Sequence, residues 1–514
     1  MKKINLKTYL LPLCLLSLAS SCQIMTNKTP ERPSVAEKDL VIYEIATKGF
    51  TSPEGAESGT FNSLKKKIPY LSELGINAVW LTGHSLADGK HFYNIWTQYA
   101  CIEPDKLDSS LGTSEEFKSM IDEFHKHGIK VFLDVITHGV VKGAPLIKQH
   151  PEWFKAGGTK GSWGMIDYKW KNAPEGLLVW WEKLWTDMVL KYGVDGFRLD
   201  CNARRPEIWR KIKKTCKKKN IDVTIFNEST LEKNFADTIT FAQGYRYYRN
   251  AKELDKNQAL SAPELVINPP KKNSHSECLR SLQLSCHDSG WGGFPLDKNP
   301  YMVQGSRWIF GYAGVFLPSI VIMMSGEEFD CSYRPLPNLA SSLFHAKNIG
   351  RGRWLYGSWI DWSQLENPKK RAMLEDAKKM LNIRKKYSYI IHSVPIGEKP
   401  NLKILKAKAV NNFKEKFPPP YIQWNENSAI LVVANPSVKM DLSLKINIDT
   451  TLFGEIWQKS GEVEVTDLWN SSSSPLRITA TNLKNFQLTV KKDKTPGGGI
   501  AVFHIQPVKI SPSY

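Results

Sequence analysis

Four short apolar segments of this chain each carry an acidic residue, and three of them also carry a basic side chain. The segments are residues 133–138, 196–200, 225–228 and 284–288. Their acids are Asp134, Asp200, Glu228 and Asp288, and the accompanying bases are His138, Arg198 and His287. A lone aspartate at such a place usually caps a helix or pairs with a nearby cation. Acids at the ends of several strands of one fold indicate a common site.

The pair Asp200 and Glu228 indicates the chemistry that such a site would perform. One helix-and-strand unit separates the two residues, so we expect them on adjacent strands. Two carboxyl groups that face one cleft suit the cleavage of a glycosidic bond, because one can attack the anomeric carbon while the other protonates the leaving oxygen.

The elements that must position these acids follow a repeated order of helix, glycine and strand. Helices are predicted at 64–74, 114–127 and 178–192, and each is followed by a glycine and a strand, at 78–81, 131–135 and 196–199. The middle helix opens with a capping box, from Thr113 to Glu116, and ends at Gly128. Further strands are predicted at 40–45, 223–226, 282–285 and 320–323, with a weak one near Ile239.

This alternation predicts an α/β fold with a parallel sheet. Eight units fit into residues 39–390, which favours a (β/α)8 TIM barrel. A doubly wound open sheet is the alternative, but no Gly-x-Gly-x-x-Gly motif opens the first helix. In a TIM barrel the carboxyl ends of the strands carry the site.

Residues 395–514 follow a different pattern. Apolar residues alternate with polar ones at 442–448, and further short apolar runs lie at 429–434, 487–490 and 500–505. A period of two is typical of half-buried strands. We therefore predict a C-terminal antiparallel β-sandwich domain.

The first residues are typical of an export signal. Lysines at positions 2 and 3 precede a short apolar stretch, which ends at Ala19-Ser20-Ser21-Cys22. This pattern predicts a signal peptide over residues 1–21, lipidation of Cys22 and a flexible tether over 22–38, and hence a membrane-anchored bacterial lipoprotein. A plain periplasmic or secreted protein is the alternative.

The chain is strongly basic, with a formal net charge of +19. The densest run of lysines, at 211–219, shares a predicted helix with Trp209 and Ile212, so a solvated helix face explains it. No nucleic-acid-binding motif accompanies the charge, and we do not expect a nucleic-acid partner. An anionic or substituted polysaccharide stays open as a substrate.

The acid-bearing segments resemble the four signature regions of the alpha-amylase family, glycoside hydrolase family 13. Tyr43-Glu44-Ile45, the segments 74–81, 102–104 and 111–113, and Gly326-Glu327-Glu328 resemble the same family. The resemblance covers roughly residues 40–390, and the C-terminal β domain matches the family's usual sandwich.

The resemblance implies a role for each acid. Asp200 matches the nucleophile, Glu228 the general acid/base, and Asp288 the third carboxylate, which holds sugar hydroxyls. Asp134 matches an acid that shapes the site. The implied reaction is retaining, through a covalent glycosyl ester on Asp200.

The resemblance also implies substrate-binding residues. Arg198 would keep Asp200 ionised by its charge. His138 and His287 match histidines that bind the sugar, and Tyr93 is the candidate for the aromatic residue that stacks on it. The implied substrate is an α-glucan or an oligosaccharide.

Three departures from the family pattern bear on specificity and metal binding. Thr137 stands where the family has a calcium-binding asparagine, so no cofactor is expected to be required and a calcium site is in doubt. Ala203-Arg204 replaces the Lys-His of starch α-amylases. The insertion at 140–171 is short for the family's domain B, and its Trp163 and Trp170 are equally suited to sugar stacking and to packing.

Two alternatives to a hydrolase stay open. A transglycosylase or isomerase of the same family would differ only in what intercepts the ester. A glucan-binding surface lipoprotein without catalysis is disfavoured, because all three carboxylates are present. Linkage, endo or exo action and oligomeric state follow no pattern in the sequence.

Overall fold

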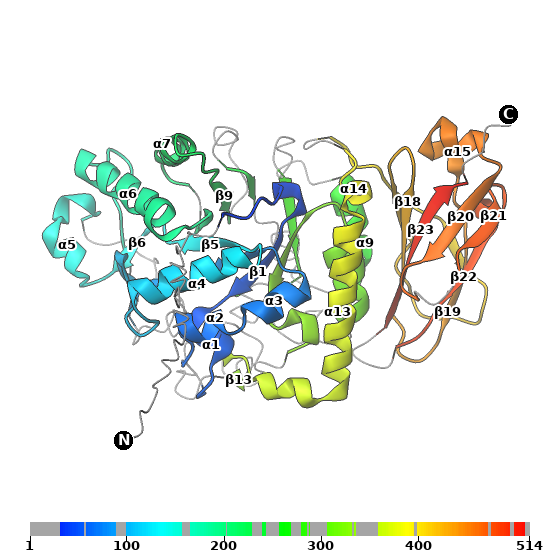
Figure 1. Cartoon of the computed structure of the whole chain (residues 1–514), viewed down its shortest axis with the longest axis horizontal. Helices are drawn as coiled ribbons and strands as arrows, with labels where there is room; N and C mark the ends of the chain where they lie inside the picture. The colour runs from blue at the N-terminus through cyan, green and yellow to red at the C-terminus, as the bar shows by residue number, and fades with distance from the viewer. Residues whose placement is uncertain are drawn as a thin grey trace, which may run out of the picture.

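The structure is a computed structural model of the 514-residue chain. It describes residues 31–55, 58–88, 99–156, 165–201, 203–228, 239–242, 256–268, 279–284, 287, 306–331, 334–335, 358–394, 398–470, 474–493 and 498–508. The barrel and the C-terminal β domain lie side by side, with the long helix α13 (Pro368–Lys386) between them (Figure 1).

Eight parallel strands close into a barrel, which confirms the TIM-barrel prediction. In spatial order they are β1 (Val41–Ile45), β12 (Ile320–Met324), β11 (Leu279–Gln283), β10 (Phe241–Ala242), β9 (Thr224–Asn227), β8 (Gly196–Leu199), β5 (Lys130–Val135) and β2 (Ala78–Leu81). The register of β5 on β8 sets Asp134 opposite Arg198. The weakly predicted sixth strand, β10, is a two-residue strand that still pairs with both of its neighbours.

Helices cover the outside of the barrel. They are α1 (Thr47–Thr51), α2 (Phe61–Lys65), α3 (Ile68–Leu74), α4 (Ser114–Lys126), α6 (Glu175–Asp187), α7 (Pro206–Lys217), α9 (Lys256–Ile267), α11 (Ser306–Ile309), α13 and α14 (Ser388–Ile391). The helices α6 and α11 continue into π-helical turns, η3 (Met188–Tyr192) and η7 (Phe310–Val315). The capping box at Thr113 and Glu116 is formed as predicted, and Gly128 has a φ of 72°.

The single helix predicted over 64–74 is wrong, because the structure has two short helices there. Lys66 and Lys67 form a turn between α2 and α3. Pro69 has no N–H to continue an α-helical hydrogen-bond ladder from the preceding turn, and it occupies the first turn of the new helix instead.

Two apolar clusters hold the barrel together. The inner one fills the barrel with Leu40, Ile42, Ala78, Trp80, Phe132, Phe226, Phe241, Ile320 and Ile322. The outer one lies between the strands and the helices. Gly196 is required on the inner face, because a Cβ there would stand 2.0 Å from the carbonyl oxygen of Thr224.

Two small antiparallel sheets extend from the carboxyl ends of β2 and β5. Strand β3 (Ser85–Ala87) pairs with β4 (Cys101–Leu107), and β6 (Gly139–Val141) pairs with β7 (Met165–Asp167). The second sheet, with α5 (Pro145–Gln149) and the short helix Pro151–Trp153, lies between β5 and α6. A third pair, β13 (Arg334–Pro335) and β14 (Ser358–Trp359), lies after β12.

The C-terminal domain consists of two packed antiparallel sheets. The larger has the order β15 (Leu402–Ile404), β17 (Tyr421–Trp424), β18 (Ala429–Asn435), β23 (Gly499–Pro507), β20 (Glu462–Asp467) and β21 (Leu476–Thr479). The smaller has the order β16 (Ala407–Ala409), β19 (Leu442–Ile446) and β22 (Phe486–Val490), and α15 (Glu455–Lys459) precedes β20. Leu431 and Val433 of one sheet and Leu444 and Ile446 of the other share one apolar core, as expected for a sandwich.

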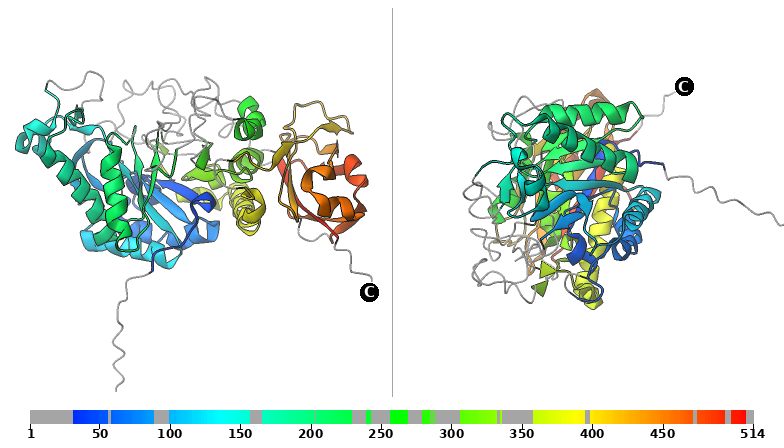
Figure 2. Two further views of the ribbon diagram at one scale, coloured as in Figure 1. Left: turned by 90° about the horizontal axis from the view of Figure 1, so that it is seen from above. Right: turned by 90° about the vertical axis from the view of Figure 1, so that its left-hand side faces the viewer.

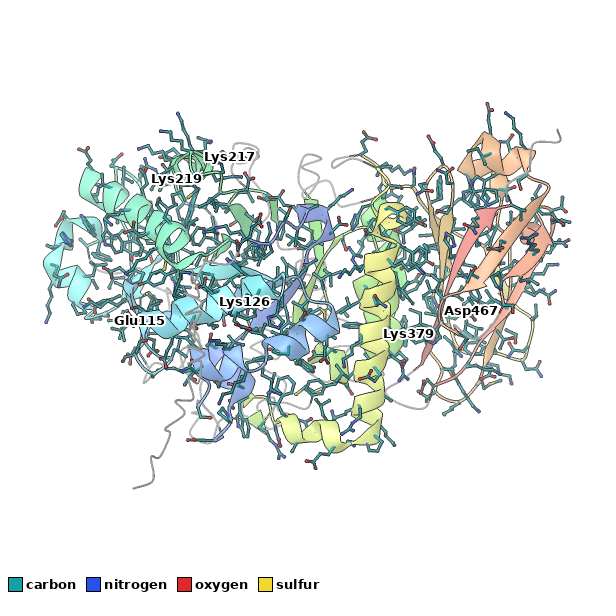
Figure 3. All side chains as sticks on the ribbon, in the orientation of Figure 1. Glu115, Lys126, Lys217, Lys219, Lys379 and Asp467 are labelled. Carbon is teal, nitrogen blue, oxygen red and sulfur yellow. The ribbon has the colours of Figure 1, made fainter. Side chains whose placement is uncertain are left out.

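The other face of the larger sheet packs against the barrel, where β18 contacts η7 and α14 and β23 contacts α11. Figure 2 shows the two domains side by side. The hydroxyl of Tyr421 donates to the carbonyl of Tyr312 at 2.9 Å, and Gln423 Nε2 donates to the carbonyl of Phe316 at 2.6 Å. Lys379 on α13 reaches the domain as well, donating to the carbonyl of Trp469 (Figure 3). These bonds and the apolar contact join the two domains over an ordered interface.

The lysine-rich run lies on the solvent face of α7 and in the turn that follows it, so it is solvated as its pattern predicts. Trp209, Ile212 and Cys216 are buried, whereas Lys217 and Lys219 extend outward (Figure 3). Across the ranges that the structure describes, no helix is both long and apolar enough to cross a bilayer.

Candidate active site

Strand alternation directs the predicted acids into the barrel mouth. Phe132 and Phe226 pack inside the barrel. Successive side chains of a strand point to opposite faces, so residues two positions further on share the inner face. These residues are Asp134 on β5 and Glu228 just after β9, and the same rule carries Arg198 and Asp200 inward from Gly196 on β8.

The Arg198 guanidinium joins three of these acids. Its Nη1 donates to Oδ1 of Asp134 at 3.0 Å and to Oδ1 of Asp200 at 2.8 Å. Its Nη2 lies 3.4 Å from Oε2 of Glu228. The Arg198 side chain is 1% exposed and stacks over the ring of Trp80, with 5.0 Å between Cζ and the ring centroid. A buried cation is thereby shared by the two carboxylates that the proposed chemistry requires.

The two oxygens of Asp200 have different surroundings. Oδ1 accepts from Arg198, whereas Oδ2 lies 3.2 Å from Nδ1 of His138 and 3.6 Å from Sγ of Cys201. Burial acts to raise the pKa of Asp200, but the nearby His138 and Arg198 outweigh it and hold that pKa well below its usual range. Asp200 is therefore ionised at neutral pH, with Oδ2 as the oxygen not bonded to Arg198.

Asp134 lies deepest of the three. Its side chain is fully buried and accepts from Arg198, from the hydroxyl of Tyr99 and from Nε1 of Trp80 at 3.2 Å. Burial raises the pKa of Asp134 to about 6, although Arg198 acts to lower it. This position fits an acid that anchors the other groups rather than one that reaches a substrate.

Glu228 is the most open of these acids, since 15% of its side chain is exposed against 9% for Asp200. The backbone N–H of Cys201 donates to its Oε2 at 2.7 Å. Cys201 has a φ of 64°, in the left-handed region, so the chain turns sharply after Asp200 and directs this N–H toward β9. The turn thus links the two carboxylates through the backbone as well as through Arg198.

His287 lies at the end of the barrel after β11. Its Nδ1 donates to Oε1 of Glu44 on β1, and its Nε2 lies 3.5 Å from the hydroxyl of Tyr99. Its ring also packs edge-on against Trp80, at 5.6 Å between centroids. A buried carboxylate therefore fixes the orientation of the imidazole.

The structure thus brings together Asp134, His138, Arg198, Asp200, Glu228 and His287. Asp288, Tyr93 and Trp163 lie outside the described residues. Trp170 packs between Tyr168 and Trp181 and donates from Nε1 to the carbonyl of Thr137 at 2.7 Å, which is a structural position.

Sequence reasoning missed three groups that complete the network: Tyr99, the Cys201 N–H and Glu44. The hydroxyl of Tyr99 accepts from Arg198 at 2.9 Å and donates to Asp134. Tyr99 lies four residues before the Glu103-Pro104 motif, and no sequence pattern marks it as a site residue. The position of a backbone N–H cannot be predicted from residue types at all. Glu44 lay in a family-like segment and follows inward-facing Ile42 by two positions.

The residues around Thr137 do not fit a calcium ion. The Thr137 hydroxyl donates to the carbonyl of Asp200 at 2.6 Å, and its own carbonyl accepts from Trp170. In the described part of the chain, the one group of acidic, histidine and cysteine side chains close enough to share an ion is His138, Asp200 and Cys201. Calcium prefers six to eight oxygen ligands, which this group does not offer.

Comparison with known proteins agrees with this arrangement. The family model for the alpha-amylase catalytic domain matches residues 44–149, from Glu44 on β1 to the insertion after β5. Over this segment the chain is similar to the alpha-amylase catalytic domain. A 1,4-alpha-glucan-branching enzyme of Debaryomyces hansenii is 27% identical over 318 residues, which is 58% of this chain. The alpha-amylase MalA of Haloarcula japonica is 25% identical over 236 residues, which is 41% of this chain.

The similarity to a solved structure extends further along the chain. A maltogenic alpha-amylase, AmyB of Thermotoga neapolitana, superimposes with a TM-score of 0.65 over 91% of this chain and 99% of that one, at 17% identity. This similarity concerns the fold. The chain spans 39% of the length of the branching enzyme and 33% of the length of MalA.

Proposed function

We propose that this protein is a member of the alpha-amylase family and a retaining glycoside hydrolase that cleaves α-glucosidic bonds of α-glucans or their oligosaccharides. The observation that carries the proposal is that Arg198 contacts both Asp200 and Glu228, each through a different nitrogen. The guanidinium holds Asp200 ionised through Oδ1 and contacts Glu228 through its other nitrogen. One acid is thereby ready to attack, and the more exposed acid stands beside it.

The first step follows from this geometry. Oδ2 of Asp200 attacks the anomeric carbon, and Glu228 gives its proton to the leaving glycosidic oxygen, so the ester forms as the old bond breaks. Arg198 remains bonded to Oδ1 and balances the charge that shifts along the carboxylate. The Cys201 N–H keeps Oε2 of Glu228 in place, so Oε1 carries the proton that is transferred.

In the second step Glu228 removes a proton from water, and the resulting hydroxide displaces Asp200 with a second inversion. The product retains the α configuration. His138 lies against Asp200, and Glu44 fixes the orientation of His287, which supports a role for both imidazoles in binding sugar hydroxyls. Asp288 is proposed to hold hydroxyls of the same sugar.

The proposal is tested by product analysis on a panel of α-glucans and maltooligosaccharides. The wild type is compared with Glu228→Gln and with Glu455→Gln, an 82% exposed glutamate on α15 that serves as the matched control. We expect freshly released sugars to be α-anomers, with release lost in Glu228→Gln and unchanged in Glu455→Gln. Release of β-anomers, or full activity of Glu228→Gln, would contradict the mechanism.

The same assay separates hydrolysis from transfer. Transfer to a sugar is the second candidate, because the chain is similar to a 1,4-alpha-glucan-branching enzyme. Longer or rearranged oligosaccharides without net release of reducing ends would identify a sugar hydroxyl as the acceptor. No turnover of any α-glucan with binding intact would indicate a glucan-binding protein instead.

We also propose that the protein is exported and anchored through a lipid on Cys22. The basic start and the apolar stretch before Cys22 support export and lipidation. The contacts of Arg32 indicate where the tether meets the barrel. Arg32 donates to the carbonyls of Val189 and Val194 and pairs with Asp195, at the end of the barrel opposite the acids. Metabolic labelling with a radioactive fatty acid should label the wild type and fail to label Cys22→Ala. Labelling of that variant would refute the anchor.

A further inference from the structure

Three side chains of different chemistry meet at one oxygen of Asp200. Nδ1 of His138 lies 3.2 Å from Oδ2, and Sγ of Cys201 lies 3.6 Å from the same atom. All three candidate ligand atoms lie within 4.8 Å of one another. In the part of the chain that the structure describes, Nδ1 of His138 is buried, and its approach to Oδ2 of Asp200 is not aligned as a hydrogen bond.

These separations match those around a tetrahedral metal ion. With bonds of roughly 2.1 Å to nitrogen and oxygen and 2.3 Å to sulfur, a tetrahedral centre sets nitrogen about 3.4 Å and sulfur about 3.6 Å from the oxygen. The observed 3.2 Å and 3.6 Å agree with these values. The remaining pair, nitrogen and sulfur, needs at most a modest rotation of His138 to reach about 3.6 Å.

The donor set selects the class of ion. A thiolate and an imidazole favour zinc and related borderline or soft cations, whereas calcium and magnesium prefer oxygen ligands. Arg198 does not compete for the same atom, because it bonds the other oxygen, Oδ1. Three protein ligands leave a fourth position of a tetrahedral ion for a water, as in zinc sites that hold one.

We propose that His138, Asp200 and Cys201 form an inhibitory site for a zinc-class divalent cation. Binding converts the Cys201 thiol to a metal thiolate and releases one proton to solvent, and His138 binds in its neutral form. The cation occupies Oδ2, the oxygen that would attack the sugar, and therefore blocks ester formation. Cys201, the residue directly after Asp200, makes the site possible.

Cadmium is the probe, because a cadmium–thiolate bond absorbs in the ultraviolet. Titration of the full chain with Cd²⁺ should show this absorbance saturating at one equivalent, and Zn²⁺ should displace it whereas Ca²⁺ should not. The band should vanish in Cys201→Ser and persist in Cys216→Ser, the matched control at a buried cysteine on α7. His138→Gln should weaken Cd²⁺ binding at least about tenfold, since loss of even an outer partner of a metal ligand costs that much.

The binding measurements do not depend on the proposed function, and inhibition is measured separately. In the hydrolase, Zn²⁺ should inhibit competitively with the α-glucan, and Cys201→Ser should be at least about tenfold less sensitive than Cys216→Ser when each is compared with its own metal-free rate. A thiolate band that survives in Cys201→Ser, or Cd²⁺ affinity that His138→Gln leaves unchanged, would overturn the site. If Cys201→Ser does not fold, the His138→Gln titration decides alone.

Discussion

Replacing Arg198 by methionine should move the acid limb of the pH profile. The guanidinium contacts Asp134, Asp200 and Glu228, and methionine keeps its buried volume without its charge. An opposite charge at such range lowers a carboxyl pKa by about 1–3 units, so its removal should raise the pKa of Asp200 by that amount. Because only ionised Asp200 can attack, the acid limb of kcat/KM should shift upward by about 1–3 pH units.

The stability of Arg198→Met should depend on pH with a definite sign. The pKa of Asp200 is depressed in the folded state, so its contribution to stability is present above the unfolded pKa and is lost as the pH falls through the folded pKa. Loss of one partner from a buried ion pair costs about 3–5 kcal/mol. The deficit should be largest near neutral pH and should shrink below about pH 4, where the carboxyls are protonated in the unfolded chain.

Two measurements check this reasoning: pH profiles of kcat/KM and urea unfolding at several pH values. Arg384→Met is the control for the profile, because that buried arginine bonds the carbonyls of Leu317 and Ser319 far from the acids. It should lose stability and keep the wild-type acid limb. An unshifted acid limb in Arg198→Met would refute the assignment of Arg198 as the group that keeps Asp200 ionised.

Three further outcomes follow from the same network. The pKa of Asp134 is raised to about 6, so the unfolding free energy of the wild type should fall by roughly 3 kcal/mol as the pH rises from about 4 to about 6. Urea unfolding of Asp134→Asn should not show this fall. The same pH dependence in the variant and the wild type would contradict the raised pKa. Tyr99→Phe removes the hydroxyl between Arg198 and Asp134 and should cost about 1–3 kcal/mol in unfolding free energy, with a lower kcat/KM, whereas a neutral effect would place the hydroxyl outside the network. Dialysis against a calcium chelator should leave activity unchanged or raised, because Thr137 and its neighbours do not form a calcium site, and activity lost to the chelator and restored by calcium would contradict this.

The barrel could be predicted from sequence because its signals are local. A capping box at Thr113 and a left-handed glycine at Gly128 define where α4 begins and ends, whatever packs against it. The acids at the strand ends could be predicted for the same reason, since a period of two fixes which side chains face inward. The same period of two predicts that Arg198 faces inward, because it lies two positions after the inward-facing Gly196.

The rest depends on contacts between distant residues. The strands β15 and β16 have three residues each, and β21 is largely exposed, so neither length nor alternation revealed them. The contact between Tyr99 and Asp134 joins segments 35 residues apart through a loop that has no pattern of its own. The cluster of possible metal ligands around Asp200 depends on the left-handed backbone conformation of Cys201. No recognisable sequence motif predicts that turn.

Trapping the covalent intermediate would show directly whether Asp200 is the nucleophile. An α-maltosyl fluoride needs no acid to lose its leaving group, so in Glu228→Gln the ester should form, and without a base it should accumulate. Mass spectrometry should then find one glycosyl unit on the peptide that contains Asp200, and none in a second variant that also carries Asp200→Asn. A fluoride that is consumed without any adduct, or an adduct on another residue, would contradict Asp200 as the nucleophile.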